Sequence, residues 1–133
     1  MLEYKECAFF MEEDAISEAV LIVEDDLDIG EFLVQAIMEE TSHKAMLVTD
    51  GFMALNAIAK IKPTLFILDY QMPRMNGIQL YDRLQEMQEF QDVPVIMISA
   101  YLPQQEVAKR KIIGIRKPLD LNMFLDMVEK LLA

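Results

Sequence analysis

The chain has 133 residues, 53% of them hydrophobic, and carries a formal net charge of −11 at pH 7. That length fits one domain, and the hydrophobic content excludes a chain that is disordered throughout. The acidic balance argues against direct nucleic-acid binding, which requires a basic face. We therefore expect a folded domain whose partners are not nucleic acids.

A single cysteine, Cys7, excludes an internal disulfide bond and fits a reducing compartment. The apolar run around it spans only residues 7–11 and is surrounded by acids, so we expect neither a signal peptide nor a membrane span. The sequence thus predicts a cytoplasmic protein that does not contact a membrane.

Apolar runs alternate with helical patterns from Ala19 to the end of the chain. The runs predict five strands, at residues 19–23, 44–48, 64–68, 93–99 and 112–116. Apolar residues spaced three and four apart predict a helix after each strand, at about residues 27–41, 52–62, 77–87, 103–110 and 121–132.

Such nearly continuous apolar strands predict a parallel sheet that is covered by helices on both faces. Right-handed crossovers then favour a doubly wound α/β fold of the flavodoxin-like type, with five strands in the order 2-1-3-4-5. We expect this domain to span residues 19–133, with no further domain after its last helix. Residues 1–18 stand outside the pattern and are interpreted as an N-terminal extension.

Polar side chains follow four of the predicted strands at the point where each strand ends. In chain order they are Glu24, Asp25, Asp26, Asp69, Ser99 and Lys117. Taken singly, each has an ordinary explanation as a helix cap, a turn residue or a solvated charge. The carboxyl ends of parallel strands meet at one edge of a sheet, however, so we expect these side chains to lie close together.

Together these residues indicate a phosphoryl-transfer site. Neighbouring carboxylates repel each other by about 4 kcal/mol per close pair at an effective dielectric constant of about 20. Mg²⁺ prefers oxygen ligands and relieves this repulsion. Lys117 adds a compact positive charge for a phosphoryl oxygen, and Ser99 adds a hydroxyl donor. Asp69 is then the candidate phosphoryl acceptor, whereas Asp26 is expected to cap the first helix.

Four segments, VLIVEDDLDI, LFILDYQMPRMNG, VIMISA and IRKPLD, resemble the receiver domain of two-component response regulators, over about residues 20–133. The resemblance implies that Asp69 takes a phosphoryl group from a histidine kinase or a phosphotransfer protein. It implies Mg²⁺ ligands from Glu24, Asp25, Asp69 and the backbone carbonyl of Gln71.

The same resemblance assigns a role to each of the remaining residues at the strand ends. Ser99 corresponds to the switch hydroxyl and Lys117 to the phosphate contact, with a cis Lys117–Pro118 bond. A domain of this kind is not a turnover enzyme. It signals by contact with a downstream protein, whose identity stays open, as does homodimerisation.

The sequence departs from the family pattern between Ser99 and Lys117. An aromatic residue is usual three positions before the lysine, where this chain has Gly114. Only 117 − 99 = 18 positions separate the two residues, fewer than usual, so the helix between them is shortened. Tyr101 is either a substitute for the missing ring or a surface residue, and we favour the surface. The basic residues 109–111 are interpreted as the charge complement of a helix C-terminus, or as a partner contact.

Three alternatives stay open. One is a degenerate receiver that acts as a docking module without phosphorylation, which the departure at Gly114 supports. Another is a phosphatase with an aspartate nucleophile, which needs a second aspartate two positions after Asp69, where this chain has Gln71. A nucleotide binder is the third, but the chain has only four glycines and no glycine-rich loop to hold phosphates.

Overall fold

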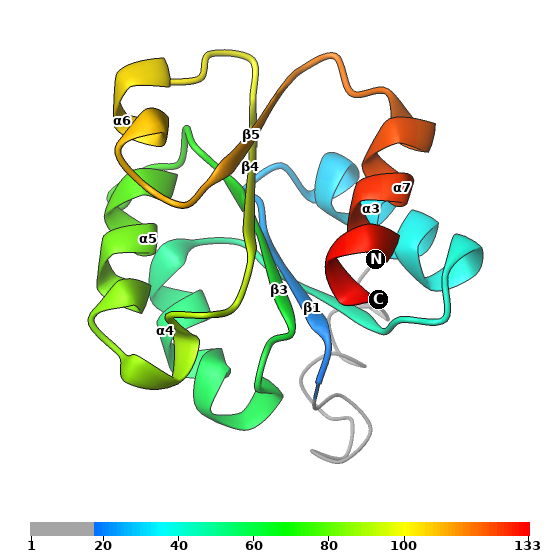
Figure 1. Ribbon diagram of the computed structural model, residues 1–133, viewed down its shortest axis with the longest axis horizontal. Helices are drawn as coiled ribbons and strands as arrows, with labels where there is room; N and C mark the ends of the chain where they lie inside the picture. Colours follow the sequence, from blue (N-terminus) through cyan, green and yellow to red (C-terminus); the bar gives the residue numbers. More distant parts are fainter. Residues whose placement is uncertain (1–17) are drawn as a thin grey trace.

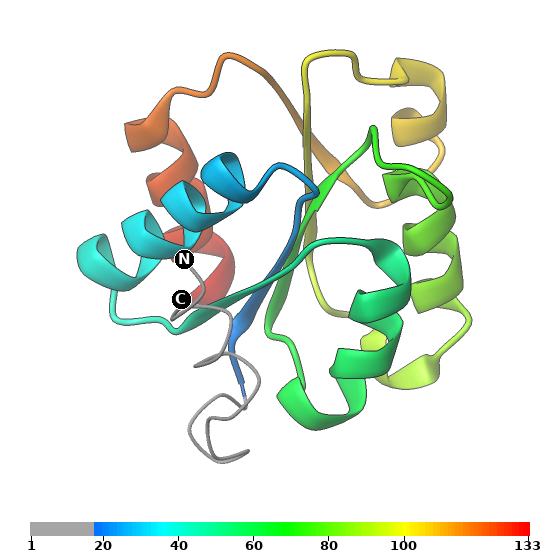
Figure 2. The ribbon, with the colours of Figure 1, turned by 180° about the vertical axis from the view of Figure 1, so that it is seen from behind.

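In the computed structural model, which describes residues 18–133, a single parallel sheet lies between two layers of helices (Figure 1 and Figure 2). The strand order is β2-β1-β3-β4-β5, which confirms the predicted order and the doubly wound fold. The strands are β1 (Val20–Val23), β2 (Ala45–Val48), β3 (Leu65–Asp69), β4 (Val95–Ser99) and β5 (Ile113–Arg116).

The helices divide between the two faces of the sheet. On one face lie α3 (Leu27–Glu40) and α7 (Leu121–Leu132), and on the other lie α4 (Gly51–Ile61), α5 (Gly77–Gln85) and α6 (Gln104–Ala108) (Figure 1). A short 3-10 turn, η1 (Gln88–Phe90), follows α5 and was not predicted. The helix predicted over residues 103–110 is shorter still, because α6 has only five residues.

The core is split by the sheet into two apolar clusters. Successive side chains of a strand point to opposite faces. In β1, Leu21 and Val23 therefore pack toward α4 and α5, while Val20 and Ile22 pack toward α3 and α7. All four are fully buried. Burial on both faces explains why the strands are continuous apolar runs rather than alternating ones.

Helix caps fix the chain where it leaves the carboxyl ends of the strands. The Asp26 carboxylate accepts hydrogen bonds from the backbone N–H groups of Asp28 and Ile29, which confirms the predicted cap of α3. Asn76 caps α5 in a reciprocal pair with Gln79. A cap of this kind stabilises a helix by about 1 kcal/mol. The caps therefore hold the strand-end residues between rigid elements.

Within residues 18–133, no helix has the length and apolar character that crossing a membrane requires. The expected N-terminal extension falls almost wholly on residues 1–17, which lie outside the described part of the chain.

Candidate functional site at the carboxyl edge of the sheet

Strand register brings Glu24 level with Asp69. Val23 pairs with Leu68 in adjacent parallel strands, so the next residue of each chain segment lies side by side. Alternation directs both side chains to the face that α3 and α7 cover, the face on which Val20, Ile22 and Ile67 are buried. The two acids therefore share one corner of the sheet.

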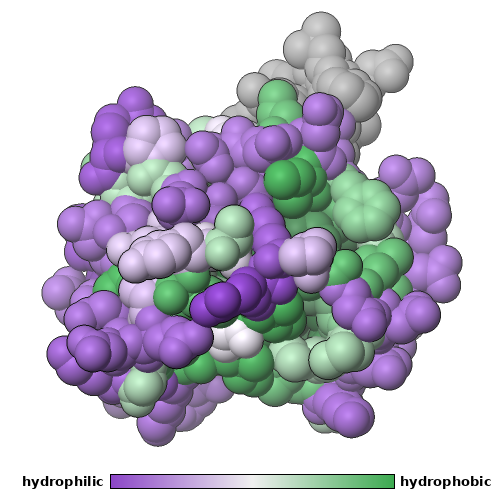
Figure 3. Space-filling view, turned by 90° about the horizontal axis from the view of Figure 1, so that it is seen from above, coloured by the Kyte–Doolittle hydropathy of each residue, from purple (hydrophilic) through white to green (hydrophobic). Residues whose placement is uncertain are grey.

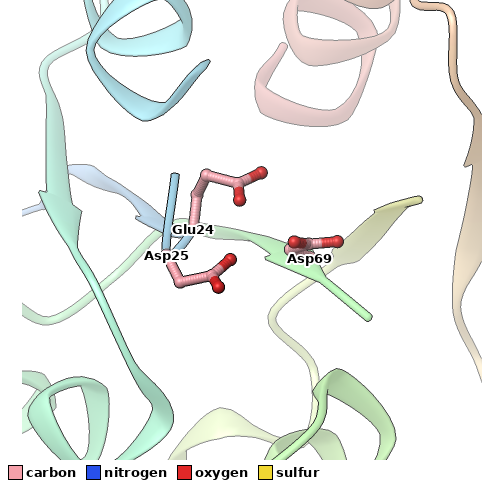
Figure 4. A group of neighbouring side chains, drawn as sticks. All are labelled: Glu24, Asp25 and Asp69. Atoms are coloured by element: carbon pink, nitrogen blue, oxygen red, sulfur yellow. The ribbon is translucent and has the colours of Figure 1, made fainter. Parts of the chain in front are cut away.

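Three carboxylates meet in this corner. Glu24, Asp25 and Asp69 each offer an oxygen, and these oxygens all lie within 4.8 Å of one another. Their side chains point toward a common centre from the ends of β1 and β3 (Figure 4). Glu24 is 3% exposed and Asp69 is 8% exposed, whereas Asp25 is exposed to solvent. The cluster is thus buried on the side of Glu24 and Asp69 and open to solvent at Asp25, along the carboxyl edge of the sheet.

Lys117 supplies a positive charge to the cluster. Lys117 directly follows the last residue of β5, and its Nζ lies 3.5 Å from Oε1 of Glu24. Its backbone N–H donates to the carbonyl oxygen of Ser99 at 3.0 Å, which fixes the end of β5 against β4. The Lys117–Pro118 peptide bond is cis, in agreement with the resemblance. One ammonium group thus lies beside the two buried acids, Glu24 and Asp69.

Burial changes how readily Glu24 ionises. Loss of hydration raises the pKa of Glu24 to about 8, and the neighbouring Asp69 carboxylate adds to the rise. The backbone N–H of Asp26, which donates to Glu24 at 3.1 Å, and the Lys117 ammonium oppose this rise without cancelling it. In the metal-free protein at neutral pH, Glu24 therefore holds a proton.

The pKa of Asp69 is also raised above its ordinary value, mainly because burial removes water from the carboxylate. Lys117 and the backbone N–H of Gln71 act against this rise. Burial thus disfavours the ionised form of both carboxyl groups, and a divalent cation would supply the positive charge that favours it. The hard oxygen donors and their close spacing fit Mg²⁺.

Ser99 lies at the same edge but on the opposite face of the sheet. It is the last residue of β4 and is 1% exposed. Alternation along β4 places its side chain with Val95 and Met97, toward α5 and α6. Its Oγ accepts a hydrogen bond from the backbone N–H of Tyr101 at 3.3 Å. Ser99 therefore bonds to the segment that enters α6, on the face of the sheet opposite the acid cluster.

The remaining sequence-based candidates lie around this corner. Gln71 is exposed, two residues beyond the end of β3. Tyr101 is 68% exposed, so the surface position that we favoured is confirmed. The space above Gly114 is filled instead by Leu102, which had no distinguishing feature in the sequence. Seen from above, this side of the molecule is mostly hydrophilic with small apolar areas (Figure 3).

The basic run at residues 109–111 has a structural role that the sequence did not specify. The Arg110 guanidinium binds both carboxylate oxygens of Asp82 on α5, with N–O distances of 2.8 and 2.9 Å. It also donates to the carbonyl oxygen of Glu106 at 2.8 Å and to its carboxylate at 3.0 Å. Hydrogen bonds from Arg110 lower the pKa of Asp82. Arg110 thus ties the short α6 to α5.

Comparisons with known proteins agree with this geometry. The family model for the response regulator receiver domain matches residues 20–129. The chain is 28% identical over 121 residues to sporulation initiation phosphotransferase F of Bacillus subtilis, with 88% of this chain and 95% of that protein covered. It is 31% identical over 123 residues to the Regulator of RpoS of Escherichia coli, and these cover 89% of this chain but only 36% of that longer protein.

Solved structures show the same fold. A two-component response regulator from Legionella pneumophila superposes with a TM-score of 0.76 at 26% identity, covering 87% of this chain and 98% of that one. The chemotaxis protein CheY4 of Vibrio cholerae gives a TM-score of 0.78 at 21% identity, covering 86% and 98%, which supports the fold alone. With most of its length matched by the family model, the chain belongs to the response regulator receiver domain family.

Proposed function

We propose that this receiver domain accepts a phosphoryl group on Asp69 and signals by protein contact. The observation that carries the proposal is the group of three carboxylates within 4.8 Å of one another, with Lys117 beside them. Like charges are brought together in a buried corner only at a cost in free energy. That arrangement is useful where a cation and a phosphoryl group supply the missing countercharges.

In the proposed reaction, a carboxylate oxygen of Asp69 attacks the phosphorus of a phosphohistidine on a histidine kinase or phosphotransfer protein. An O–P bond forms as the N–P bond breaks, and the electron pair returns to the imidazole nitrogen, which takes a proton from water. β3 holds Asp69 rigidly, so the acceptor is fixed in place for an in-line approach.

Each neighbour of Asp69 has a place in this proposal. Glu24, Asp25, Asp69 and the backbone carbonyl of Gln71 would hold Mg²⁺, which supplies positive charge to the phosphoryl oxygens. The Lys117 ammonium, 3.5 Å from Glu24, would turn to a phosphoryl oxygen. The Ser99 hydroxyl would donate to another. A cytoplasmic location and the histidine kinase partner belong to the same proposal.

The test is intact-mass spectrometry of the full chain after incubation with acetyl phosphate. We expect a single phosphoryl adduct, formed with release of acetate, that requires Mg²⁺ and disappears in Asp69→Asn. Asp92→Asn is the matched control, because Asp92 is an exposed acid outside the cluster. Absence of an adduct, under conditions where another receiver domain is fully labelled, would favour the phosphorylation-independent docking module.

A further inference from the structure

A surface hollow of about 360 Å³ lies where α4 and α5 run side by side, and we call it the α4–α5 hollow (Figure 1 and Figure 2). Phe52 of α4 lines it and is 46% exposed. The other lining residues come from α5 and from the segment before it: Arg74, Met75, Gln79, Asp82 and Arg83. The hollow thus combines an exposed aromatic ring with two guanidinium groups.

The acids at the α4–α5 hollow already have partners. Asp82 binds Arg110 through both of its carboxylate oxygens. Asp50 caps α4 and accepts a hydrogen bond from Arg74 at 3.2 Å. The Arg83 guanidinium, by contrast, forms no ion pair with any residue in the range 18–133. The hollow therefore offers an unpaired cation, and a carboxylate is the group that would match it.

Helix α4 connects the beginning of the described chain to this hollow. The Glu18 backbone N–H donates to the carbonyl oxygen of Ile61, the last residue of α4, at 2.7 Å. Phe52 lies 61 − 52 = 9 residues earlier on the same helix, which is about 14 Å along the helix axis. The only charged residue of α4 is Lys60. An acidic segment that follows α4 from Glu18 therefore meets no like charge on that helix.

The residues before Glu18 carry the matching chemistry in sequence. Residues 9–14, which precede the described range, are FFMEED. The three acids stand 18 − 14 = 4 to 18 − 12 = 6 positions before Glu18, and the two phenylalanines 18 − 10 = 8 and 18 − 9 = 9 positions before it. At a maximum of about 3.3 Å per residue, the acids can reach roughly 13–20 Å and the rings roughly 26–30 Å from Glu18. Both groups can therefore reach the hollow.

The order of these groups agrees with the order of their candidate partners. Helices α4 and α5 both begin at the carboxyl edge of the sheet, where Phe52 is the second residue of α4. Arg83 lies 83 − 77 = 6 residues along α5, about 9 Å from that edge. A chain that leaves Ile61 toward the edge therefore passes Arg83 before Phe52. Counted back from Glu18, the acids likewise come before the phenylalanines.

We propose that residues 9–14 of this chain dock in the α4–α5 hollow, with the acids beside Arg83 and the phenylalanine rings against Phe52. Aromatic rings pack favourably edge to face or offset. A covalent tether of this length holds a segment near its site at an effective concentration on the order of millimolar, so weak contacts are sufficient. The docking covers the segment between β3 and α5 and does not depend on phosphorylation of Asp69.

The other large exposed apolar side chains are a poorer match for an acidic segment. Phe32 is 53% exposed on α3, but α3 contains four acids and no cation. Met123 is 64% exposed on α7, where Asp126 and Glu129 outnumber Lys130. Like charges would oppose docking of residues 12–14 on either helix. Charge therefore selects the α4–α5 hollow over the opposite face of the sheet.

The experiment places a nitroxide spin label on Cys7, the only cysteine of the chain, in the full-length protein. Paramagnetic broadening of backbone amide NMR signals then reports which surface the segment approaches, with a diamagnetic label of the same shape as the reference. We expect broadening at Phe52 and Arg83 and much less at Phe32, which lies on the opposite face of the sheet.

Reversal of the charges tests the ion pairs. Arg83→Glu replaces an attractive contact by a repulsive one and should reduce the broadening at Phe52 by about fivefold, as expected for loss of an exposed ion pair. Glu12→Lys, Glu13→Lys and Asp14→Lys, introduced together, should reduce it as well. The combination of these three substitutions with Arg83→Glu should restore the broadening, because the attraction returns with its signs exchanged.

Two matched controls separate the contacts from general effects of charge and size. Lys130→Glu makes the same change of charge on α7 and should leave the broadening at the wild-type level. Phe52→Ala should reduce the broadening at Arg83, whereas Phe32→Ala removes an equally exposed ring from the other face and should not.

Equal broadening on both faces of the sheet, or broadening on neither, would overturn the docking. Unchanged broadening at Phe52 in Arg83→Glu would overturn the assigned contacts. A mixture of spin-labelled chains with isotope-enriched chains that carry no spin label identifies the source. Broadening of the enriched chains would mean that the segment of a second copy occupies the hollow, and it would overturn docking within one chain.

Discussion

At the scale of single residues, the electrostatics of the carboxyl edge decide what the site binds. The acid cluster and Lys117 were predicted from one observation, that polar residues follow apolar strands and that parallel strands end at one edge. Sequence reasoning did not supply the protonation of Glu24, because the pKa depends on a burial that only the packed helices create.

This protonation predicts that Mg²⁺ binding depends on pH. The cation must displace a proton from Glu24 below pH 8, so apparent affinity should fall by up to about tenfold per pH unit as pH decreases. Calorimetry in two buffers of different ionisation enthalpy should show proton release at pH 7. Glu24→Gln should bind more weakly at pH 8 with a flatter pH profile. Affinity that does not change between pH 6 and pH 8 would contradict the assignment.

Two glycines provide a residue-scale test of how Asp69 is positioned. A Cβ on Gly77 would lie 2.5 Å from the carbonyl oxygen of Asp69, and that backbone cannot retreat without moving the acceptor. A Cβ on Gly30 would meet only the Leu47 side chain, at 2.6 Å, which can rotate away. Gly77→Ala should therefore reduce the free energy of unfolding by about 2 kcal/mol, and Gly30→Ala by clearly less.

Urea unfolding measures both variants, and the rate of adduct formation measures the position of Asp69. Gly77→Ala should slow labelling because the acceptor moves out of line. Equal stability and equal labelling of the two variants would show that the chain at Asp69 adapts to the added methyl group.

At the scale of elements, the sequence predicted which helices and strands exist but not how α6 is attached. The pairing of Arg110 with Asp82 joins residues 28 positions apart, and it depends on where α5 and the end of α6 meet in space. The cover that Leu102 forms over Gly114 is likewise a contact of a loop with a strand. Periodicity reports which face of an element is buried and carries no information about such pairs.

The Arg110 contacts predict a local effect. Arg110→Ala removes a bidentate ion pair and should lower the free energy of unfolding by about 1 kcal/mol. It should also speed amide exchange in α6, which has few other anchors. Lys109→Ala is the matched control, because Lys109 makes a single pair with Glu106 at 3.7 Å and is well exposed. Similar effects of the two substitutions would mean that Arg110 does not anchor α6.

At the scale of the whole molecule, the strand order and both layers followed from the sequence, because the rules for parallel sheets leave few topologies. The N-terminal extension at residues 1–18 stays a prediction. The acid cluster, by contrast, lowers the free energy of unfolding of the whole protein. Its effect appears as a dependence of that free energy on pH.

The folded, metal-free protein binds protons more tightly at Glu24 and Asp69 than the unfolded chain does. Between the ordinary glutamate pKa of 4.5 and about 8, the native state therefore carries more protons, and stability should fall as pH rises through this window. The lowered pKa of Asp82 acts below its ordinary value of 3.8, outside the window. Mg²⁺ should restore stability at pH 8, where the carboxylates are free to bind it.

Melting temperatures at pH 5.5 and pH 8, with a chelator and with Mg²⁺, test this dependence. Glu24→Gln should melt at more nearly equal temperatures at the two pH values without metal. A metal-free wild type that melts higher at pH 8 than at pH 5.5 would contradict the direction of the pKa shift.

Strand alternation places Glu24 and Asp69 on one face of the sheet and Ser99 and Gly114 on the other, where Leu102 also packs. A genetic consequence follows from this division. Substitutions of Glu24 or Asp69 on the first face should yield alleles that cannot be modified, whereas Gly114→Ala on the second face should leave the modification of Asp69 intact. A chain that carries both kinds of substitution should behave like the allele that cannot be modified. Modification of Asp69 would then be the earlier of the two events.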